Sequence, residues 1–163
     1  MTIDELNACD RDLFVATFGA IFERSPWVAE RAWASRPFVS RDDLHRAMVE
    51  TLRSASRDEQ HVLLRAHPDL GTKAHMSDAS VGEQAGAGLD RLTPEEYHRL
   101  TNSASAYRER FGFPFLLAVH GLTKHDVFTA LAERLPGNPE AEWQEALEQV
   151  GRIAAFRLRD VVE

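Results

Sequence analysis

The sequence predicts an all-α protein, a single compact helical domain over residues 1–163 with one extended buried segment near residues 111–121. Helix-start signals recur along the chain, whereas no alternating strand pattern, internal repeat or linker is found. A length of 163 residues fits one domain better than two. Hydrophobic residues make up 44% and charged residues 28%, which is typical of a globular protein.

Each predicted helix begins at a capping side chain or at a proline in the first turn. In chain order these starts are Thr2, Asp10, Ser25, Ser40, Ser56, Thr93, Thr123 and Asn138. Prolines, or the end of the helical pattern, predict where the helices stop. The predicted stops are at about Phe22, Pro37, His67, Phe111 and Leu135, and the last helix continues to the C-terminus.

The segment 111–121 is the predicted exception to helix. Gly112 and Gly121 bracket it, and Pro114 interrupts it. We expect an extended, buried chain without strand partners. Its backbone groups must therefore bond side chains, water or a ligand.

Composition excludes several function classes. The net charge of −7, from 26 acidic and 19 basic residues, disfavours nucleic acid as a partner. No apolar run approaches the roughly 20 residues of a membrane span. The polar N-terminus lacks the features of a secretory signal, so we expect a cytoplasmic protein. The single Cys9 excludes an internal disulfide and a cysteine zinc cluster, and no His-x-x-x-His or His-Glu-x-x-His pattern occurs, so no metal site is expected.

Two short motifs could carry chemistry. His67 closes a predicted helix, where the helix dipole favours its protonated form and suits a proton donor; taken alone, a merely structural histidine is the more common case. Ser80 and Glu83 have capping-box spacing, which alone favours a simple helix start. Against that interpretation, Gly82 is a poor first-turn residue and Gln84 lies one turn from Ser80 on the same face.

The last helix carries an arginine at or beside its inward stripe. The stripe is apolar and spaced by three and four, and consists of Trp143, Leu147, Val150, Ala154, Leu158 and Val161. Arg157 must therefore pair with an acidic side chain, extend its guanidinium to the protein surface or bind a buried anion. Structural pairing and ligand binding are equally consistent with this position.

Taken together, these pieces resemble the family of 2-oxo-4-hydroxy-4-carboxy-5-ureidoimidazoline (OHCU) decarboxylases. The matching stretches are His-Pro-Asp-Leu-Gly at 67–71, Ser-x-x-Glu-Gln at 80–84, Ala-Gly-Leu at 87–89, Phe-Gly-Phe-Pro-Phe-Leu-Leu-Ala-Val at 111–119 and Arg-Leu at 157–158. Their order and spacing agree from about residue 10 to about residue 160. The resemblance implies the all-α fold of this family, often a homodimer, and the last step from urate to (S)-allantoin without cofactor.

The resemblance also implies the residues of the site. His67 is similar to the catalytic proton donor, and Glu83 could orient it or strengthen its protonated form. The implied substrate-binding residues are Pro68, Ser80, Val81, Gly82, Glu83, Gln84, Phe115, Leu116, Leu117, Ala118, Val119 and Arg157. The implied partner is the small anionic substrate OHCU.

Two alternatives stay open. A helical protein-interaction module would keep the core pattern but does not need His67, Glu83 and Arg157 together. A related enzyme acting on another ureido compound would keep the site and change the pocket. A phosphate-binding enzyme fits poorly, because the chain has no glycine-rich phosphate loop.

Overall fold

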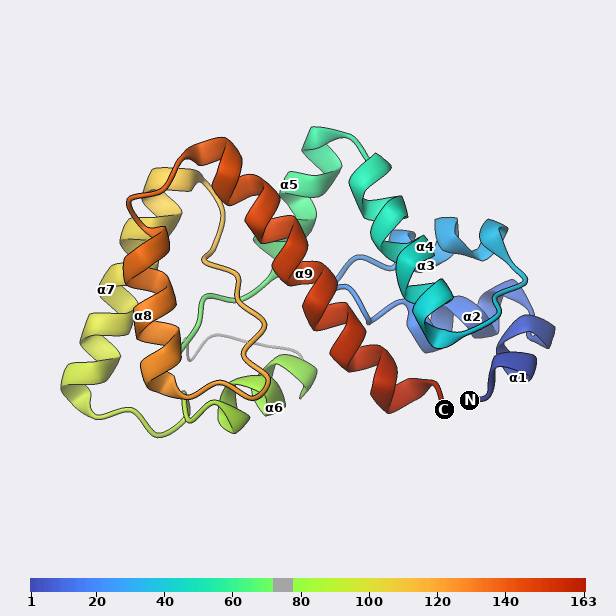
Figure 1. The fold of residues 1–163 in the computed structure, drawn as a ribbon, viewed down its shortest axis with the longest axis horizontal. Coiled ribbons are helices and arrows are strands. Elements are labelled where there is room, and N and C mark those ends of the chain that lie inside the picture. The colour runs from blue at the N-terminus through green and yellow to red at the C-terminus, as the bar shows by residue number, and fades with distance from the viewer. Residues whose placement is uncertain (72–77) are drawn as a thin grey trace. The chain divides into compact units, whose positions relative to one another are not determined.

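A computed structural model describes residues 1–71 and 78–163, and every regular element in those ranges is a helix (Figure 1). The predicted all-α class is confirmed. The chain divides into two compact units, one formed by residues 1–66 with 151–163 and the other by residues 67–150. The single domain stays a prediction. None of the helices in the described ranges is long and apolar enough to cross a membrane.

The first unit contains the N-terminal helices and the end of the last helix. Its elements are α1 (Ile3–Ala8), α2 (Arg11–Phe18), α3 (Trp27–Ala32), the 3₁₀ turn η1 (Trp33–Ser35), α4 (Arg41–Ser54), α5 (Arg57–Ala66) and the C-terminal part of α9 (Pro139–Val161). Three predicted caps are confirmed, because the side chains of Thr2, Asp10 and Ser40 accept hydrogen bonds from the first turns of α1, α2 and α4. The local sequence thus determines where these helices begin.

Helix α2 is shorter than predicted, because it ends at Phe18 and not near Phe22. At Gly19 the chain turns so closely that a Cβ would lie 2.6 Å from the Val15 carbonyl oxygen. Ile21 and Phe22 are nonetheless buried, as their spacing predicts. The core prediction is therefore correct although the helix boundary is wrong.

The core of the first unit is built on an aromatic cluster. The ring of Phe14 lies 4.8 Å from Phe18, 5.3 Å from Trp33 and 6.3 Å from Phe38, measured between ring centres. Tilted and edge-on contacts of this kind add to the area that the rings bury. The cluster joins α2 to the chain that follows α3.

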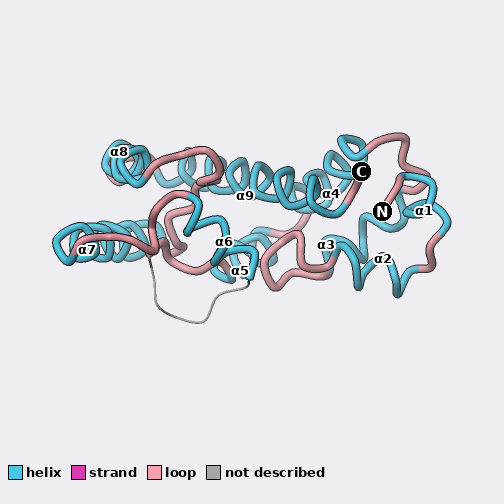
Figure 2. Tube along the Cα trace, turned by 90° about the horizontal axis from the view of Figure 1, so that it is seen from below, coloured by secondary structure: helices cyan, strands magenta, loops and turns pink. Residues whose placement is uncertain are grey.

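The second unit contains α6 (Asp78–Gly86), α7 (Pro94–Phe111), α8 (Lys124–Arg134) and the beginning of α9. Helices α7 and α8 lie side by side, as the two views of the trace agree (Figure 2). A capping box of Thr93 and Glu96 begins α7, as predicted, and Gly112 ends it with φ +81°. That left-handed conformation favours glycine and turns the chain into the segment 113–121.

The segment from Phe113 to Val119 has neither helix nor strand conformation and is largely buried, as predicted. In Figure 1 it is the gold and orange chain that joins α7 to α8. The ring centre of Tyr107 lies 5.2 Å from Phe115 and 6.0 Å from Phe113, and Trp143 lies 5.6 Å from Phe113. This aromatic core seats the segment against α7 and α9.

The predicted inward stripe of α9 is confirmed for five of its members, which are between 0% and 6% exposed: Trp143, Leu147, Val150, Ala154 and Leu158. Val161 is half-buried instead, and its neighbour Val162 is 1% exposed. The helix ends at Val161, so the helical spacing no longer decides which side chain turns inward there.

Candidate functional site

The His-Pro-Asp-Leu-Gly turn begins where α5 ends. Helix α5 stops at Ala66, and His67 follows it directly and is 5% exposed. Asp69 is held in place by Arg108 of α7, whose Nε and Nη2 both donate to one carboxylate oxygen at 3.2 and 3.1 Å. The position of His67 at a helix C-terminus is thus as the sequence predicts.

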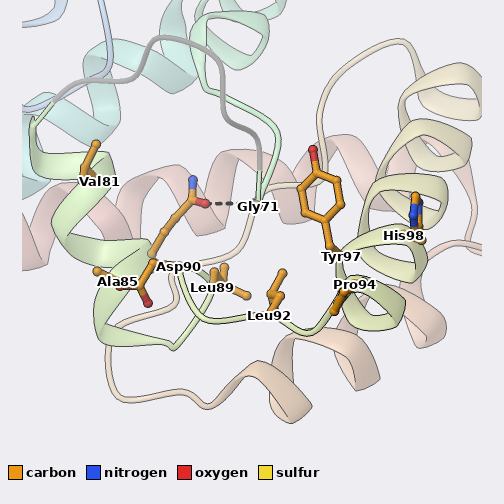
Figure 3. Close-up of a pocket in the computed structure, with 10 residues that line it drawn as sticks. Gly71, Val81, Ala85, Leu89, Asp90, Leu92, Pro94, Tyr97 and His98 are labelled. Atoms are coloured by element: carbon orange, nitrogen blue, oxygen red, sulfur yellow. Dashed lines mark hydrogen bonds between the residues drawn. The ribbon is translucent and has the colours of Figure 1, made fainter.

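A side-chain hydrogen bond joins this turn to α6. The Gly71 N–H donates to Gln84 Oε1 at 2.9 Å, which Figure 3 shows as a dashed line. Gln84 is 6% exposed and Ser80, one turn earlier, is 4% exposed, so both face inward. Two of the sequence motifs that suggested a site, at 67–71 and 80–84, are therefore neighbours in one unit.

The interpretation of Ser80 as a helix cap is wrong. Helix α6 has already begun at Asp78, so Ser80 lies inside it and Gly82 lies near its middle. Because the helix runs through this motif, the side chains of Ser80 and Gln84 share one buried face, while Val81 and Gly82 are exposed. Glu83 is half-buried.

A pocket of about 610 Å³ opens beside Gln84, and Figure 3 shows how its lining side chains lie. Its walls are mostly apolar, with an amide, a carboxylate, a phenol and an imidazole among them. The described residues that line it are Gly71, Val81, Gln84, Ala85, Leu89, Asp90, Leu92, Pro94, Tyr97 and His98. Of the predicted site residues it contains Val81 and Gln84, while Asp90, Tyr97 and His98 had no sequence signal.

The buried segment 113–119 obtains backbone partners from side chains. Arg134 Nη1 donates to the Leu116 carbonyl at 2.7 Å, and the Ala118 N–H donates to Gln149 Oε1 at 2.9 Å. Of the partners that the sequence left open for this segment, side chains thus account for these two groups. The sequence feature that could have predicted the second contact is a polar residue, Gln149, beside the apolar stripe of α9.

A buried polar network supports Arg134. The Tyr107 hydroxyl donates to Glu142 Oε1 at 2.8 Å, and Arg134 Nε donates to the same oxygen at 2.9 Å. Burial, together with the hydrogen bond to Glu142, raises the pKa of Tyr107 above its ordinary value, so its hydroxyl stays a neutral donor. The network therefore gives the guanidinium a fixed place beside the segment 113–119.

Arg157 belongs to the first unit and is paired there. Its Nη1 donates to Glu23 Oε2 at 3.1 Å and to the Ile21 carbonyl at 3.3 Å. The side chains of Arg157 and Glu23 are 7% and 3% exposed. Of the two possibilities for this arginine, structural pairing is thus present, while substrate binding stays a prediction.

The described ranges, 1–71 and 78–163, hold no group of three or more His, Cys, Asp or Glu side chains placed as metal ligands would be. The second unit contains most of the predicted site residues, namely His67, Pro68, Ser80–Gln84 and Phe115–Val119. Arg157 lies in the first unit. Their assignment as a site stays a prediction.

Gly71→Ala should lower the free energy of unfolding by about 1–3 kcal/mol, because this position has a left-handed backbone. Its φ is +72°, and an added Cβ would lie 2.5 Å from Leu100 Cδ2, in a fully buried side chain. Urea unfolding measures the change. Gly82→Ala is the matched control: nothing lies within 4 Å of its Cβ position and it sits within α6, so stability should stay equal or rise. Equal losses in both variants would contradict the argument.

Comparison with known proteins identifies relatives along almost the whole chain. The family model described as OHCU decarboxylase matches residues 7–159. The uric acid degradation bifunctional protein PucL of Bacillus subtilis is 48% identical over 161 residues, which are 99% of this chain and 33% of that protein. This chain therefore spans about one third of PucL.

Two further relatives match over similar lengths of this chain. The 2-oxo-4-hydroxy-4-carboxy-5-ureidoimidazoline decarboxylase of Halalkalicoccus jeotgali is 44% identical over 161 residues, which cover 99% of this chain and 92% of that protein. A crystal structure of (S)-allantoin synthase aligns with a TM-score of 0.80 at 34% identity, covering 99% of this chain and 54% of that one. The helical fold and these relatives together define the class as a decarboxylase of urate degradation. More particularly, the chain belongs to the OHCU decarboxylase family, which confirms the resemblance found in the sequence.

Proposed function

We propose that this chain converts OHCU to (S)-allantoin and carbon dioxide without metal or organic cofactor, and that His67 protonates one face of the reacting carbon. The observation that carries the proposal is the arrangement of the second unit. The turn that follows His67 is hydrogen-bonded to the Ser-x-x-Glu-Gln helix through Gly71 and Gln84. The segment 113–119 belongs to the same unit.

The reaction requires the protein mainly to position the substrate and a proton donor. Loss of carbon dioxide leaves the electron pair of the broken C–C bond on a carbon next to a C=N bond, which accepts it. A proton then replaces the lost carboxylate. The protein needs to orient the substrate, to hold its polar groups and to deliver that proton from one side.

The burial of His67 and of the segment 113–119 supports the roles proposed for them. His67 is buried at a helix C-terminus, where the dipole favours the protonated form that donates. In the proposal, Glu83 orients this imidazole. The buried aromatic segment excludes water from the carboxylate, which favours its departure as a neutral gas. Arg157 supplies a fork of donors for substrate oxygens, and its pairing with Glu23 would hold that fork still.

Circular dichroism during enzymatic oxidation of urate tests the proposal. The unstable substrate is generated in place by an enzyme that oxidises urate and one that hydrolyses its product. Addition of this chain should produce the optically active signal of (S)-allantoin rapidly, also after dialysis against EDTA. Only slow, optically inactive decay would reject the substrate and leave a related ureido compound or an interaction module.

The proposal includes a homodimer, which the family resemblance supports. Light scattering after gel filtration should give twice the 18.4 kDa of one chain. A cytoplasmic location stays a prediction from the sequence.

A further inference from the structure

Two side chains hold the segment that joins α7 to α8. The Leu116 carbonyl accepts from Arg134 at 2.7 Å, and the Ala118 N–H donates to Gln149 at 2.9 Å. The two anchors, Arg134 and Gln149, therefore fix the main chain at residues 116 and 118.

The anchors do not bond the backbone groups of Phe115 and Leu117. Within residues 1–71 and 78–163, neither residue makes a backbone hydrogen bond. Phe115 is 1% exposed and Leu117 is half-buried, and peptide groups in such places are nearly always paired. Amide and ureido groups of a ligand can bond these backbone groups, as an added strand bonds the edge of a sheet.

The anchors are themselves fixed by carboxylates. Gln149 Nε2 donates to Glu145 Oε1 at 2.7 Å, one turn earlier on α9, which leaves Oε1 of the amide directed at the segment. Arg134 Nε donates to Glu142 Oε1 at 2.9 Å. Gln149 and Glu142 are 4% and 6% exposed. Neither anchor can turn away from the segment without losing a second, partly buried hydrogen bond.

We propose that Gln149 and Arg134 are positioning residues for the decarboxylation, because they fix the segment 115–119, whose remaining backbone groups present the substrate to His67. The inference rests on the proposed function, since it requires the substrate to bind this backbone. Neither anchor touches the substrate. A small shift of the segment misplaces the reacting carbon relative to the proton donor, which weakens binding and slows the reaction.

Gln149 is the better probe of the two. Loss of the Arg134 side chain would leave the buried carboxylate of Glu142 without its cation, which destabilises the fold by itself. Loss of the Gln149 amide removes no charge, and the Glu145 carboxylate to which it donates is only half-buried, so the fold should lose less stability.

Gln149→Leu should raise KM about tenfold, on the scale of one buried hydrogen bond, with a smaller fall in kcat and unchanged helical content. The rescue is the exchange Glu145→Gln with Gln149→Glu, in which an amide at position 145 donates to a carboxylate at position 149. That carboxylate can still accept from Ala118, so KM should return to within about threefold of wild type. Gln144→Leu is the matched control, since Gln144 is exposed on α9 and bonds Glu140 at 3.2 Å; its KM should not change.

A folded Gln149→Leu variant with wild-type KM overturns the inference. If that variant does not fold, Gln149→Glu alone replaces it, because two carboxylates then lie one turn apart and repel. A KM raised in this variant and restored in the exchange supports the inference, and equal KM values in both overturn it. A wild-type chain that forms no (S)-allantoin refutes the proposed function instead, so the two failures are distinguishable.

Discussion

His67→Asn should abolish the rapid, optically active formation of (S)-allantoin, with a fall in kcat of about 10²–10⁴. Asparagine keeps a polar amide of similar size, so the buried position can remain filled and hydrogen-bonded. It cannot carry a proton at neutral pH, whereas an imidazole can. Circular dichroism of the coupled urate reaction measures the rate, and far-ultraviolet dichroism shows that the helices are retained.

The informative control is a second histidine. His98 lines the pocket beside Gln84, and its side chain is exposed. His98→Asn should keep the catalysed rate within about threefold of wild type, because no general acid is lost at the reacting carbon. A fully active His67→Asn variant would refute the assignment. Loss of activity in His98→Asn, with His67→Asn still active, would assign the proton donor to the pocket that His98 lines.

Local signals in the sequence predict much of the fold. The capping boxes at Thr2 and Thr93 begin helices where expected, because each cap satisfies backbone N–H groups within its own first turn. Gly112 and Pro114 predict correctly that the helix α7 ends and that an irregular buried segment follows. These features depend on residues three or four apart, which a sequence displays directly.

The sequence alone does not predict contacts between residues that are far apart along the chain. Ser80 and Glu83 have the spacing of a cap, yet α6 has already begun at Asp78, so the spacing alone misplaces the helix start. Nothing in the sequence pairs Gly71 with Gln84, or Ala118 with Gln149 across 31 residues. Polar side chains can bond any backbone group that the fold brings near them. The family resemblance supplied site residues that no such local rule could give.

The ion pair of Arg157 and Glu23 also joins residues far apart in the sequence, and its loss should have the largest effect on stability. Arg157→Met should lower the free energy of unfolding by about 3–5 kcal/mol, because it removes the guanidinium that lies 3.1 Å from the buried Glu23 carboxylate. Urea unfolding followed by circular dichroism measures the loss. Glu23→Leu combined with Arg157→Met should recover most of it, since an apolar pair of similar volume also removes the buried carboxylate.

Kinetics of the same two variants separate the two roles of Arg157. If the guanidinium binds substrate, the double variant regains stability but keeps a raised KM or a lowered kcat, because neither new side chain can donate to an anion. Arg157→Lys should behave in the same direction, since a point charge cannot reproduce two parallel hydrogen bonds. A double variant with both the stability and the kinetics of wild type would show that Arg157 only holds Glu23 in the first unit. Substrate binding would then depend on the residues of the second unit alone.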